Sequence, residues 1–158
     1  MNDVFIFLEN YFIYIWLAVM SYILIVFYFG AKKANKLFDT FDEGKVVYSE
    51  KGASGYSMES FRTRNGGSSK LLHILITPDE LVFTSYFFVL FVAKRSDLLH
   101  RVPIKSIESL DIEKGRWSPK LHVKFKNERG ESKDVVVVSS NIDKIKSLLE
   151  ELKSSNNP

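Results

Sequence analysis

Residues 11–29 read YFIYIWLAVMSYILIVFYF, nineteen consecutive residues without a formal charge. At a rise of 1.5 Å per residue, a helix of this length spans about 28 Å, close to the roughly 30 Å hydrocarbon thickness of a bilayer. A lone segment in lipid must satisfy its own backbone hydrogen bonds, which only a helix does. The sequence therefore predicts a transmembrane helix, with residues 1–30 as an N-terminal membrane anchor.

Two other interpretations of this stretch are less consistent with the sequence. A buried core helix is disfavoured because so small a domain cannot enclose nineteen uncharged residues. A cleaved signal peptide is disfavoured because no Lys or Arg precedes the run, and the run is longer than the usual apolar region of about 7–15 residues. We expect an uncleaved anchor that contacts the lipid bilayer through Tyr11 to Phe29.

The flanks of the stretch predict its orientation. Tyr11 and Trp16 lie toward one end and Tyr28 lies at the other, as expected of aromatic residues at the two membrane interfaces. Lys32 and Lys33 follow directly, and positive flanks favour the cytoplasmic side. The sequence predicts a single-pass membrane protein with its N-terminus outside and its C-terminal domain cytoplasmic.

The charge is unevenly distributed. Asp3 and Glu9 give the first thirty residues a net charge of −2. Because the whole chain has a net charge of +3, residues 31–158 carry +5. A mildly basic domain suits the anionic inner leaflet, which makes anionic lipid a candidate partner. The basic residues are interleaved with acidic ones and no nucleic-acid-binding motif is present, so we expect no nucleic acid partner.

The chain after the anchor divides into three parts. Residues 31–44 are a connector, expected to include a short amphipathic helix because Leu37, Phe38 and Phe41 share one helical face. Residues 45–152 read as one β domain. Residues 153–158 are expected to be a disordered tail.

The domain shows strand patterns up to its last helix. Residues 45–50 and 56–64 read as two strands separated by turn-forming Gly and Ser residues at 51–55. A clear hairpin joins residues 70–77 to 81–86 through Pro78-Asp79-Glu80, and a second is predicted from residues 87–93 and 98–102. Residues 120–126 alternate, with Leu121, Val123 and Phe125 facing the core.

The chain is expected to close with an amphipathic helix over about residues 141–152, with Ser140 and Asp143 approximating a capping box. The fold class predicted is thus a single transmembrane α-helix plus a mainly-β domain. Six to seven antiparallel strands would form a roll or barrel closed by the C-terminal helix.

Three stretches carry a resemblance to a known family. They are GKVVY at 44–48, KLLHILITPDELVFTS at 70–85 and VPIKSI at 102–107, with the C-terminal helix completing the set. Together they resemble the PH-like superfamily, and within it GRAM-type or bacterial PH-like domains, over about residues 44–152. The resemblance implies binding of lipid head groups or protein partners rather than catalysis. The apolar run at 87–92 departs from the family pattern.

No residue pattern indicates catalysis. The chain has no Cys, and His73, His100 and His122 fall in three separate predicted strands without metal-ligand spacing. The sequence GGSSK at 66–70 has the wrong spacing for a phosphate loop and precedes a strand, so it reads as a turn. We expect no catalytic residue, no cofactor and no metal.

The outward face of residues 120–126 forms a basic stripe of Lys120, His122, Lys124 and Lys126. Asp111, Glu113 and Asp134 on the flanking strands offer opposite charges. The favoured interpretation is a solvated face with cross-strand pairs, each worth about 0.2–1 kcal/mol. A phosphate-binding surface is the alternative.

The run FFVLFV at 87–92 is the strongest functional signal, because apolar residues occupy both alternating sets of positions. Either a strand is buried on both faces, for instance under the C-terminal helix, or one face is an exposed apolar patch. The predicted partner or membrane contact residues are Phe88, Phe91, Lys94 and Arg95, with Trp117 as a further contact.

The sequence supports three functional hypotheses, which we rank. The first hypothesis is a membrane-anchored, non-catalytic module that docks a protein partner, as a subunit of a membrane assembly. The second is a sensor of lipid head groups, and an enzyme ranks third.

Overall fold

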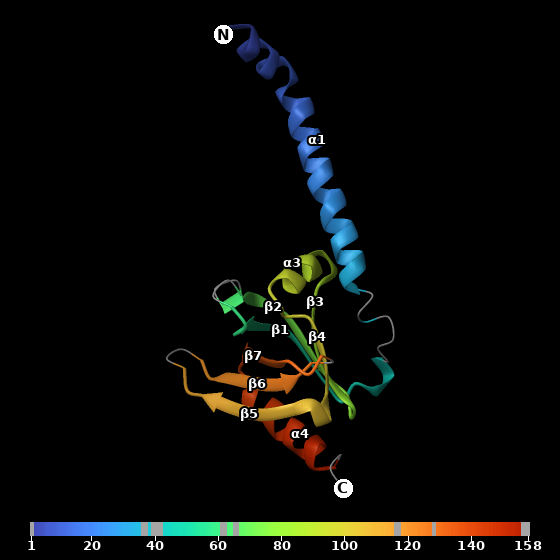
Figure 1. Ribbon diagram of the computed structural model, residues 1–158, viewed down its shortest axis with the longest axis vertical. Helices are drawn as coiled ribbons and strands as arrows, with labels where there is room; N and C mark the ends of the chain where they lie inside the picture. The colour runs from blue at the N-terminus through green and yellow to red at the C-terminus, as the bar shows by residue number, and fades with distance from the viewer. Residues whose placement is uncertain are drawn as a thin grey trace.

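A long N-terminal helix stands out from a β domain (Figure 1). The computed structural model describes residues 2–35, 38, 43–60, 63–64, 67–115, 118–127 and 129–155. Side chains are described for these residues except 2–10, Glu43 and Phe88. Helix α1 spans Asn2–Asn35, and every residue from Tyr11 to Phe29 is exposed. The alternative of a buried core helix is therefore excluded, and the helix is long and apolar enough to cross a membrane.

Seven antiparallel strands form one sheet in the order β4-β3-β2-β1-β7-β6-β5. Strands adjacent in the sequence pair within β1–β4 and within β5–β7, whereas β4 and β5 are the two edges of the sheet. The pairing of β1 with β7 joins the two halves. The strands are β1 Tyr48–Ser57, β2 Ser68–Ile76, β3 Glu80–Ser85, β4 His100–Pro103, β5 Ile107–Glu113, β6 Lys120–Lys126 and β7 Ser132–Val138. The turn η4 at Ile104–Ser106 links β4 to β5.

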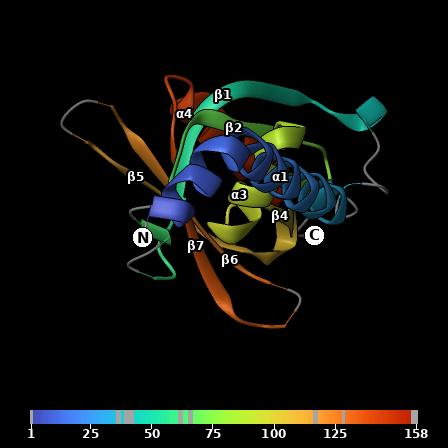
Figure 2. The same cartoon turned by 90° about the horizontal axis from the view of Figure 1, so that it is seen from above.

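The sheet bends so that its two halves face each other across the core. Seen from above, β1 and β2 lie on one side of the molecule and β6 and β7 on the other (Figure 2). The rings of His100 on β4 and Phe125 on β6 lie 5.2 Å apart, which joins an edge strand of one half to a central strand of the other. Alternating strand residues supply the core, as the 0–2% exposure of Leu121, Val123 and Phe125 shows.

The hairpin about Pro78 is confirmed. Ile76 pairs with Leu81, and the Thr77 backbone N–H donates to the Glu80 carbonyl at 2.9 Å. The Thr77 hydroxyl also accepts the Glu80 backbone N–H at 3.0 Å. The turn residues therefore set the register that buries Leu72, Ile74 and Ile76 on one face.

One strand boundary was predicted wrongly. The sequence suggests two strands separated by punctuation at residues 51–55, whereas β1 runs through that segment from Tyr48 to Ser57. Gly52 has φ +84°, and the register with β2 shifts between Lys51 and Ala53. A glycine in this conformation produces a bulge that re-aims the strand without ending it.

Helix α4, Ile142–Ser155, lies at the end of the domain far from α1 (Figure 1). Ile142, Ile145 and Leu149 are at most 1% exposed and form the predicted apolar face. The helix runs three residues into the expected tail, so residues 153–155 are helical, and residues 156–158 lie outside the described residues. The hydroxyl that accepts a hydrogen bond at the helix start, from the Asn141 N–H, is that of Ser139 and not Ser140.

The connector is described only in part. Helix α1 continues to Asn35, and a single turn η2 occupies Glu43–Lys45. Of the three residues in the predicted amphipathic helix, Leu37 and Phe41 lie outside the described residues, whereas Phe38 packs half-buried against the core.

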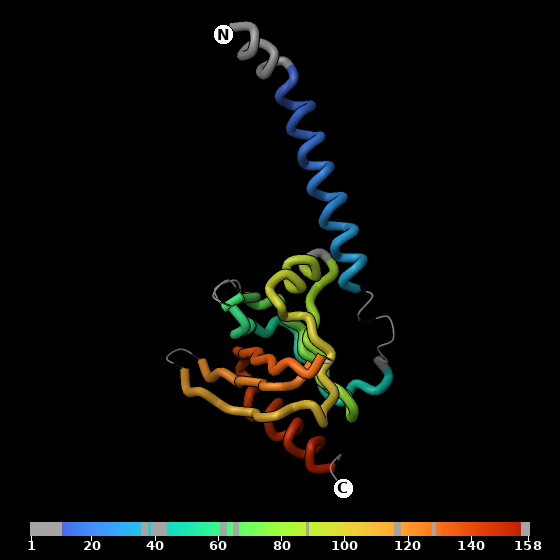
Figure 3. The backbone as a smooth tube through the Cα atoms, in the orientation of Figure 1, coloured from blue at the N-terminus to red at the C-terminus, as the bar shows by residue number. Residues whose placement is uncertain are grey.

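The predicted fold class is confirmed in its element order: an apolar N-terminal helix, seven antiparallel strands and a closing C-terminal helix. Figure 3 traces this path and shows the C-terminal part of α1 beside the β3–β4 connection. That connection is where the structure and the sequence-based prediction differ most.

Leu149 tests the role of α4. Replacing it with Ala leaves a cavity under the sheet end, and we expect the free energy of unfolding to fall by about 2–5 kcal/mol. The exposed neighbour Glu151 is the matched control, and Glu151→Ala should change stability by less than about 0.5 kcal/mol. Denaturation of the full chain in detergent, followed by circular dichroism, measures both variants. Equal effects would contradict a packing role for α4.

Candidate functional site

The segment predicted as a strand at residues 87–93 is helical. A turn η3 at Phe87–Val89 leads into helix α3, Leu90–Arg95. The predicted second hairpin is wrong, because β3 pairs directly with β4 and the two are connected through this helix. The six apolar residues are not divided between two faces of a strand.

Helical geometry resolves the lack of alternation. Leu90 and Ala93, both 2% exposed, point into the core, while Phe91 is turned toward α1. Positions three apart share one face of a helix, so one short segment serves both surfaces. The C-terminal helix was one example of a cover for this run, whereas Phe87 and Phe91 contact α1.

The end of α1 packs against η3 and α3. The rings of Phe27 and Phe91 lie 5.3 Å apart, and those of Tyr28 and Phe87 lie 6.3 Å apart. One turn further, Ala31 and Ala34 are 1% and 0% exposed and belong to the core of the β domain. The apolar helix is therefore joined to the domain by packing as well as by the chain.

Gly30 allows this close approach. A Cβ placed on Gly30 would lie 2.3 Å from Cδ2 of Phe91, well inside any real contact distance. Gly30, Ala31 and Ala34 together give α1 a seam of small residues on the side that meets the domain. Small residues at a helix interface let the backbones come close, and here they admit the Phe91 ring.

The predicted contact residues are placed as follows. Phe91 is half-buried against α1, and Lys94 and Arg95 are exposed in the last turn of α3. The Phe88 side chain and Trp117 lie outside the described residues. Of the predicted membrane-interface residues, Tyr11, Trp16, Tyr28, Lys32 and Lys33 are all exposed on α1.

Exposed apolar and basic side chains meet at this junction. Tyr86, Phe87 and Val92 are 49%, 38% and 45% exposed. Lys94 and Arg95 follow in the last turn of α3. Lys32 and Lys33 are in the last turn of α1, the helix that packs against α3. We call the set Tyr86, Phe87, Val92, Lys94 and Arg95 the junction surface.

Helix α3 ends in a Schellman motif. The Leu98 N–H donates to the Ala93 carbonyl at 3.0 Å, and the Asp97 N–H donates to the Lys94 carbonyl at 3.2 Å. Asp97 has φ +51°, the left-handed conformation in which Gly is most common and which Asp tolerates better than most residues. Asp97 thereby stops the helix and turns the chain into β4.

The Asp97 carboxylate also ties three elements together. It accepts hydrogen bonds from Ser57 Oγ at 3.1 Å and from Lys133 Nζ at 3.4 Å, and it lies 3.5 Å from His100 Nε2. Lys133 also donates to Glu59. The network joins the ends of β1 and β7 to the turn below α3.

These contacts set the charge states. Burial raises the pKa of Asp97, but hydrogen bonding to His100 and the positive charges of His100 and Lys133 outweigh it and hold the pKa well below its usual range. Burial lowers the pKa of Lys133, and the partners Glu59 and Asp97 more than reverse this, so that pKa is raised. Both groups are charged at neutral pH.

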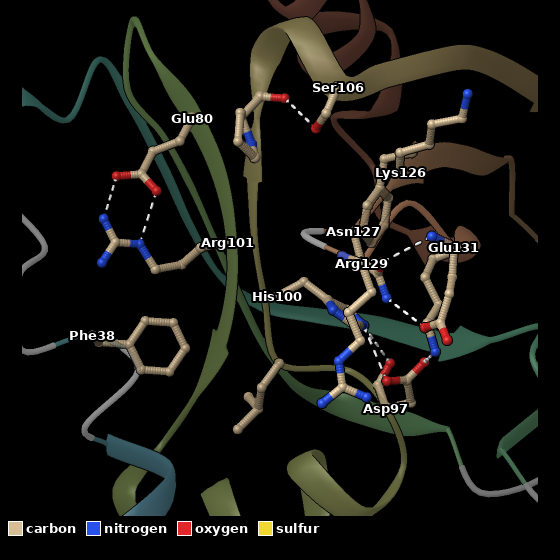
Figure 4. A pocket seen from close by; sticks show the side chains of 14 residues that line it. Phe38, Glu80, Asp97, His100, Arg101, Ser106, Lys126, Asn127, Arg129 and Glu131 are labelled. Carbon is tan, nitrogen blue, oxygen red and sulfur yellow. Dashed lines mark hydrogen bonds and ion pairs between the residues drawn. The ribbon is translucent and has the colours of Figure 1, made fainter.

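A groove of about 720 Å³ opens between β4 and the β6–β7 turn (Figure 4). Phe38, Leu99, Pro103 and Phe125 supply its apolar lining. The polar lining residues are Glu80, Asp97, His100, Arg101, Ser106, Lys126, Asn127, Arg129, Glu131 and Lys133.

Carboxylates balance most of the cations in the groove. Arg101 makes two hydrogen bonds to Glu80, at 2.8 and 2.6 Å, in the bidentate geometry seen in Figure 4. Lys133 pairs with Asp97, and Lys126 lies 3.4 Å from Glu108. The groove is thus a mixed surface and not a strongly positive one.

Ser106 and His100 in the groove contact backbone carbonyls. The Ser106 hydroxyl donates to the Pro103 carbonyl at 2.8 Å, and His100 Nε2 contacts Asp97. Neither contact is the pairing of a hydroxyl with a base that activates a nucleophile. Within the described residues, no group of His, Asp and Glu is arranged to hold a metal ion.

The basic stripe on β6 pairs across strands as predicted. Glu113 lies opposite Lys120, Asp111 opposite His122 and Asp134 opposite Lys124. His122 contacts both Glu113, at 3.2 Å, and Asp134, at 3.4 Å. The register that the sequence left open thus matches opposite charges, which supports the solvated-face interpretation.

Sequence reasoning missed the groove. Its residues come from the connector, β3, the turn between α3 and β4, β4, η4, β6, the β6–β7 turn and β7, which are spread along the sequence. The one available signal was the polar tip at residues 94–97, which was read as a hairpin turn. Asp97 in that tip is the centre of the network.

No protein family matches the sequence, and no characterised relative matches it. Solved structures do show a likeness in fold. The N-terminal PH domain of Vps36 has a TM-score of 0.48 and 15% identity, over 73% of this chain and 83% of that chain. The PDZ-RhoGEF DH/PH domains, solved in complex with GTP-gamma-S activated RhoA, have a TM-score of 0.49 and 13% identity, over 79% of this chain and 36% of that chain. At this similarity neither structure identifies a ligand or partner of this chain.

Asp97 predicts a dependence of stability on pH. Because its pKa is depressed in the fold, its contribution is complete above its unfolded value, about 3.9, and is lost as the pH falls toward the folded value. We expect the free energy of unfolding to decline below about pH 5. Asp97→Asn, which keeps the left-handed turn, should cost about 1–3 kcal/mol at pH 7 and flatten that decline. Asp79→Asn, at an exposed position of the β2–β3 turn, is the control. An unchanged acid slope in Asp97→Asn would contradict this role.

Proposed function

We propose that this chain is a membrane-anchored, non-catalytic binding module that docks a protein partner in the groove between β4 and the β6–β7 turn, as a subunit of a membrane assembly. One observation carries the proposal. The exposed apolar helix is packed onto the domain at Gly30, Ala31 and Ala34, so the groove is held in a defined orientation to whatever surrounds that helix.

Membrane insertion is the best account of α1. Nineteen successive residues, nearly all apolar, are exposed from Tyr11 to Phe29, and water would penalise that surface along its full length. Tyr11 and Tyr28 are separated by about 26 Å along the helix axis, which suits aromatic side chains at two interfaces. Lys32 and Lys33 then favour a cytoplasmic domain.

The composition of the groove favours a protein over a phosphate-bearing ligand. A phosphate site needs cations that are not already neutralised, whereas Arg101, Lys126 and Lys133 each lie near a carboxylate. Apolar walls beside paired charges resemble the mixed character of protein interfaces. The further likeness to GRAM-type and bacterial PH-like domains stays a prediction.

A sensor of lipid head groups is the alternative function. It is favoured by two exposed pairs of cations, Lys32 and Lys33 in the last turn of α1 and Lys94 and Arg95 in the last turn of α3, because these two helices pack together. A basic cluster beside a membrane span attracts anionic lipid, about 1 kcal/mol per residue. Catalysis ranks below both because the groove pairs no hydroxyl with a base among its described residues.

The proposed topology has a direct test. Protease added to intact cells should leave residues 45–152 undigested, because the domain is on the cytoplasmic side. The same protease added after membrane permeabilisation should digest exposed loops. Digestion of the domain in intact cells would contradict the orientation.

Arg129 tests the groove. It is exposed and lines the groove, so Arg129→Glu should weaken partner binding by about 1–2 kcal/mol, roughly 5–30-fold in Kd. Lys51→Glu makes the same charge change at an exposed position of β1 outside the groove and should have no effect. The measurement is quantitative copurification of the tagged full chain from native membranes in mild detergent. If both variants recover the same proteins as the wild type, the groove is not the docking site.

A further inference from the structure

The depth of the junction surface follows from its contacts with α1. Phe87 and Phe91 meet Tyr28 and Phe27, which belong to the last turn of the uncharged stretch. At 1.5 Å per residue, Phe27 lies about 8 Å along the axis from Lys32, on the side of the apolar segment. If Lys32 and Lys33 lie among the lipid phosphates, α3 is at the boundary between head groups and acyl chains.

The composition of the junction surface suits that depth. Tyr86 and Phe87, at the start of η3, and Val92, on α3, are exposed. Lys94 and Arg95 are in the last turn of α3. An apolar edge bordered by cations is the pattern of helices that lie in the interface of an anionic membrane. Figure 1 shows that α3 is the part of the domain nearest the long helix.

We propose that the junction surface is embedded in the interface of the bilayer that α1 crosses, with Val92 and Phe87 among the upper acyl chains and Lys94 and Arg95 on anionic lipid phosphates. This inference rests on the proposed membrane anchor. A second point of attachment beside the span holds the domain at one tilt and one rotation. The docking groove then faces its partner in a set direction.

The Asp97 network supports such a role. The Schellman motif and the contacts of Asp97 with Ser57, His100 and Lys133 fix the base of α3 to the sheet. The core residues Leu90 and Ala93 hold its inner face. A short helix braced in this way transmits its position in the lipid to the rest of the domain.

The sequence has no Cys, so single-cysteine variants of the full chain take one spin label each. The chain is reconstituted in vesicles of 70% phosphatidylcholine and 30% phosphatidylserine, and labels are placed at Val92→Cys, Leu24→Cys and Lys124→Cys. Collision of each label with oxygen, enriched in lipid, and with a water-soluble nickel chelate reports its depth. Leu24 reports the span, and Lys124, exposed on β6, reports the aqueous domain.

The proposal expects the oxygen-to-nickel collision ratio at Val92 to exceed that at Lys124 several-fold, with Leu24 higher still. Replacing Lys94 and Arg95 with Ser removes two cationic contacts with lipid. The ratio of molecules with the Val92 label in lipid to those with it in water should then fall about 30-fold. The same loss should follow when phosphatidylserine is omitted.

Three outcomes would overturn the proposal, and they are distinguishable. If the label at position 24 is in lipid and the label at position 92 is as exposed to water as the label at position 124, the membrane anchor is supported and the embedding of α3 is refuted. If Leu24 is itself aqueous, the anchor fails and this inference fails with it. If Val92 is shielded from both reagents, a protein covers the surface, and spin–spin broadening between labels identifies that protein as a second copy of this chain.

Discussion

The close approach of Gly30 on α1 to the Phe91 ring on α3 is the constraint on which the arrangement depends. Gly30 leaves no room for a side chain beside Phe91, and Ala31 and Ala34 enter the domain core directly below. A helix end that shares a core with its domain cannot pivot freely as a flexible tether does. The apolar helix and the β domain are therefore one packed unit at their junction.

This packing explains why the connection between β3 and β4 is a helix. The run FFVLFV at 87–92 packs into the core, contacts the end of α1 and also contributes to the exposed surface. Side chains of a strand point to two opposite faces, whereas side chains of a helix point outward in all directions around its axis. Six helical residues can therefore contact three different surroundings. The Asp97 cap and its ion pairs then hold the helix in place.

The groove and the junction surface differ in how their cations are placed. Most cations in the groove are matched by carboxylates, which favours a partner with mixed polar and apolar character. Cations at the junction border apolar side chains at the level of the apolar helix, which favours lipid. The two proposals thus assign a protein partner to the groove and the bilayer to the junction surface.

The sequence by itself determined the long apolar helix, the hairpin about Pro78, the alternating strand that buries Leu121, Val123 and Phe125, and the closing helix. These depend on local periodicity and turn chemistry, which neighbouring residues carry. Only the tertiary structure decided that residues 87–95 form a helix, that Gly52 produces a bulge within one strand, and that Asp97, His100 and Lys133 meet. The physical reason is that each depends on contacts between segments distant in the chain, and for the Phe87 run those contacts with α1 and the core override a local pattern that fits strand and helix equally well.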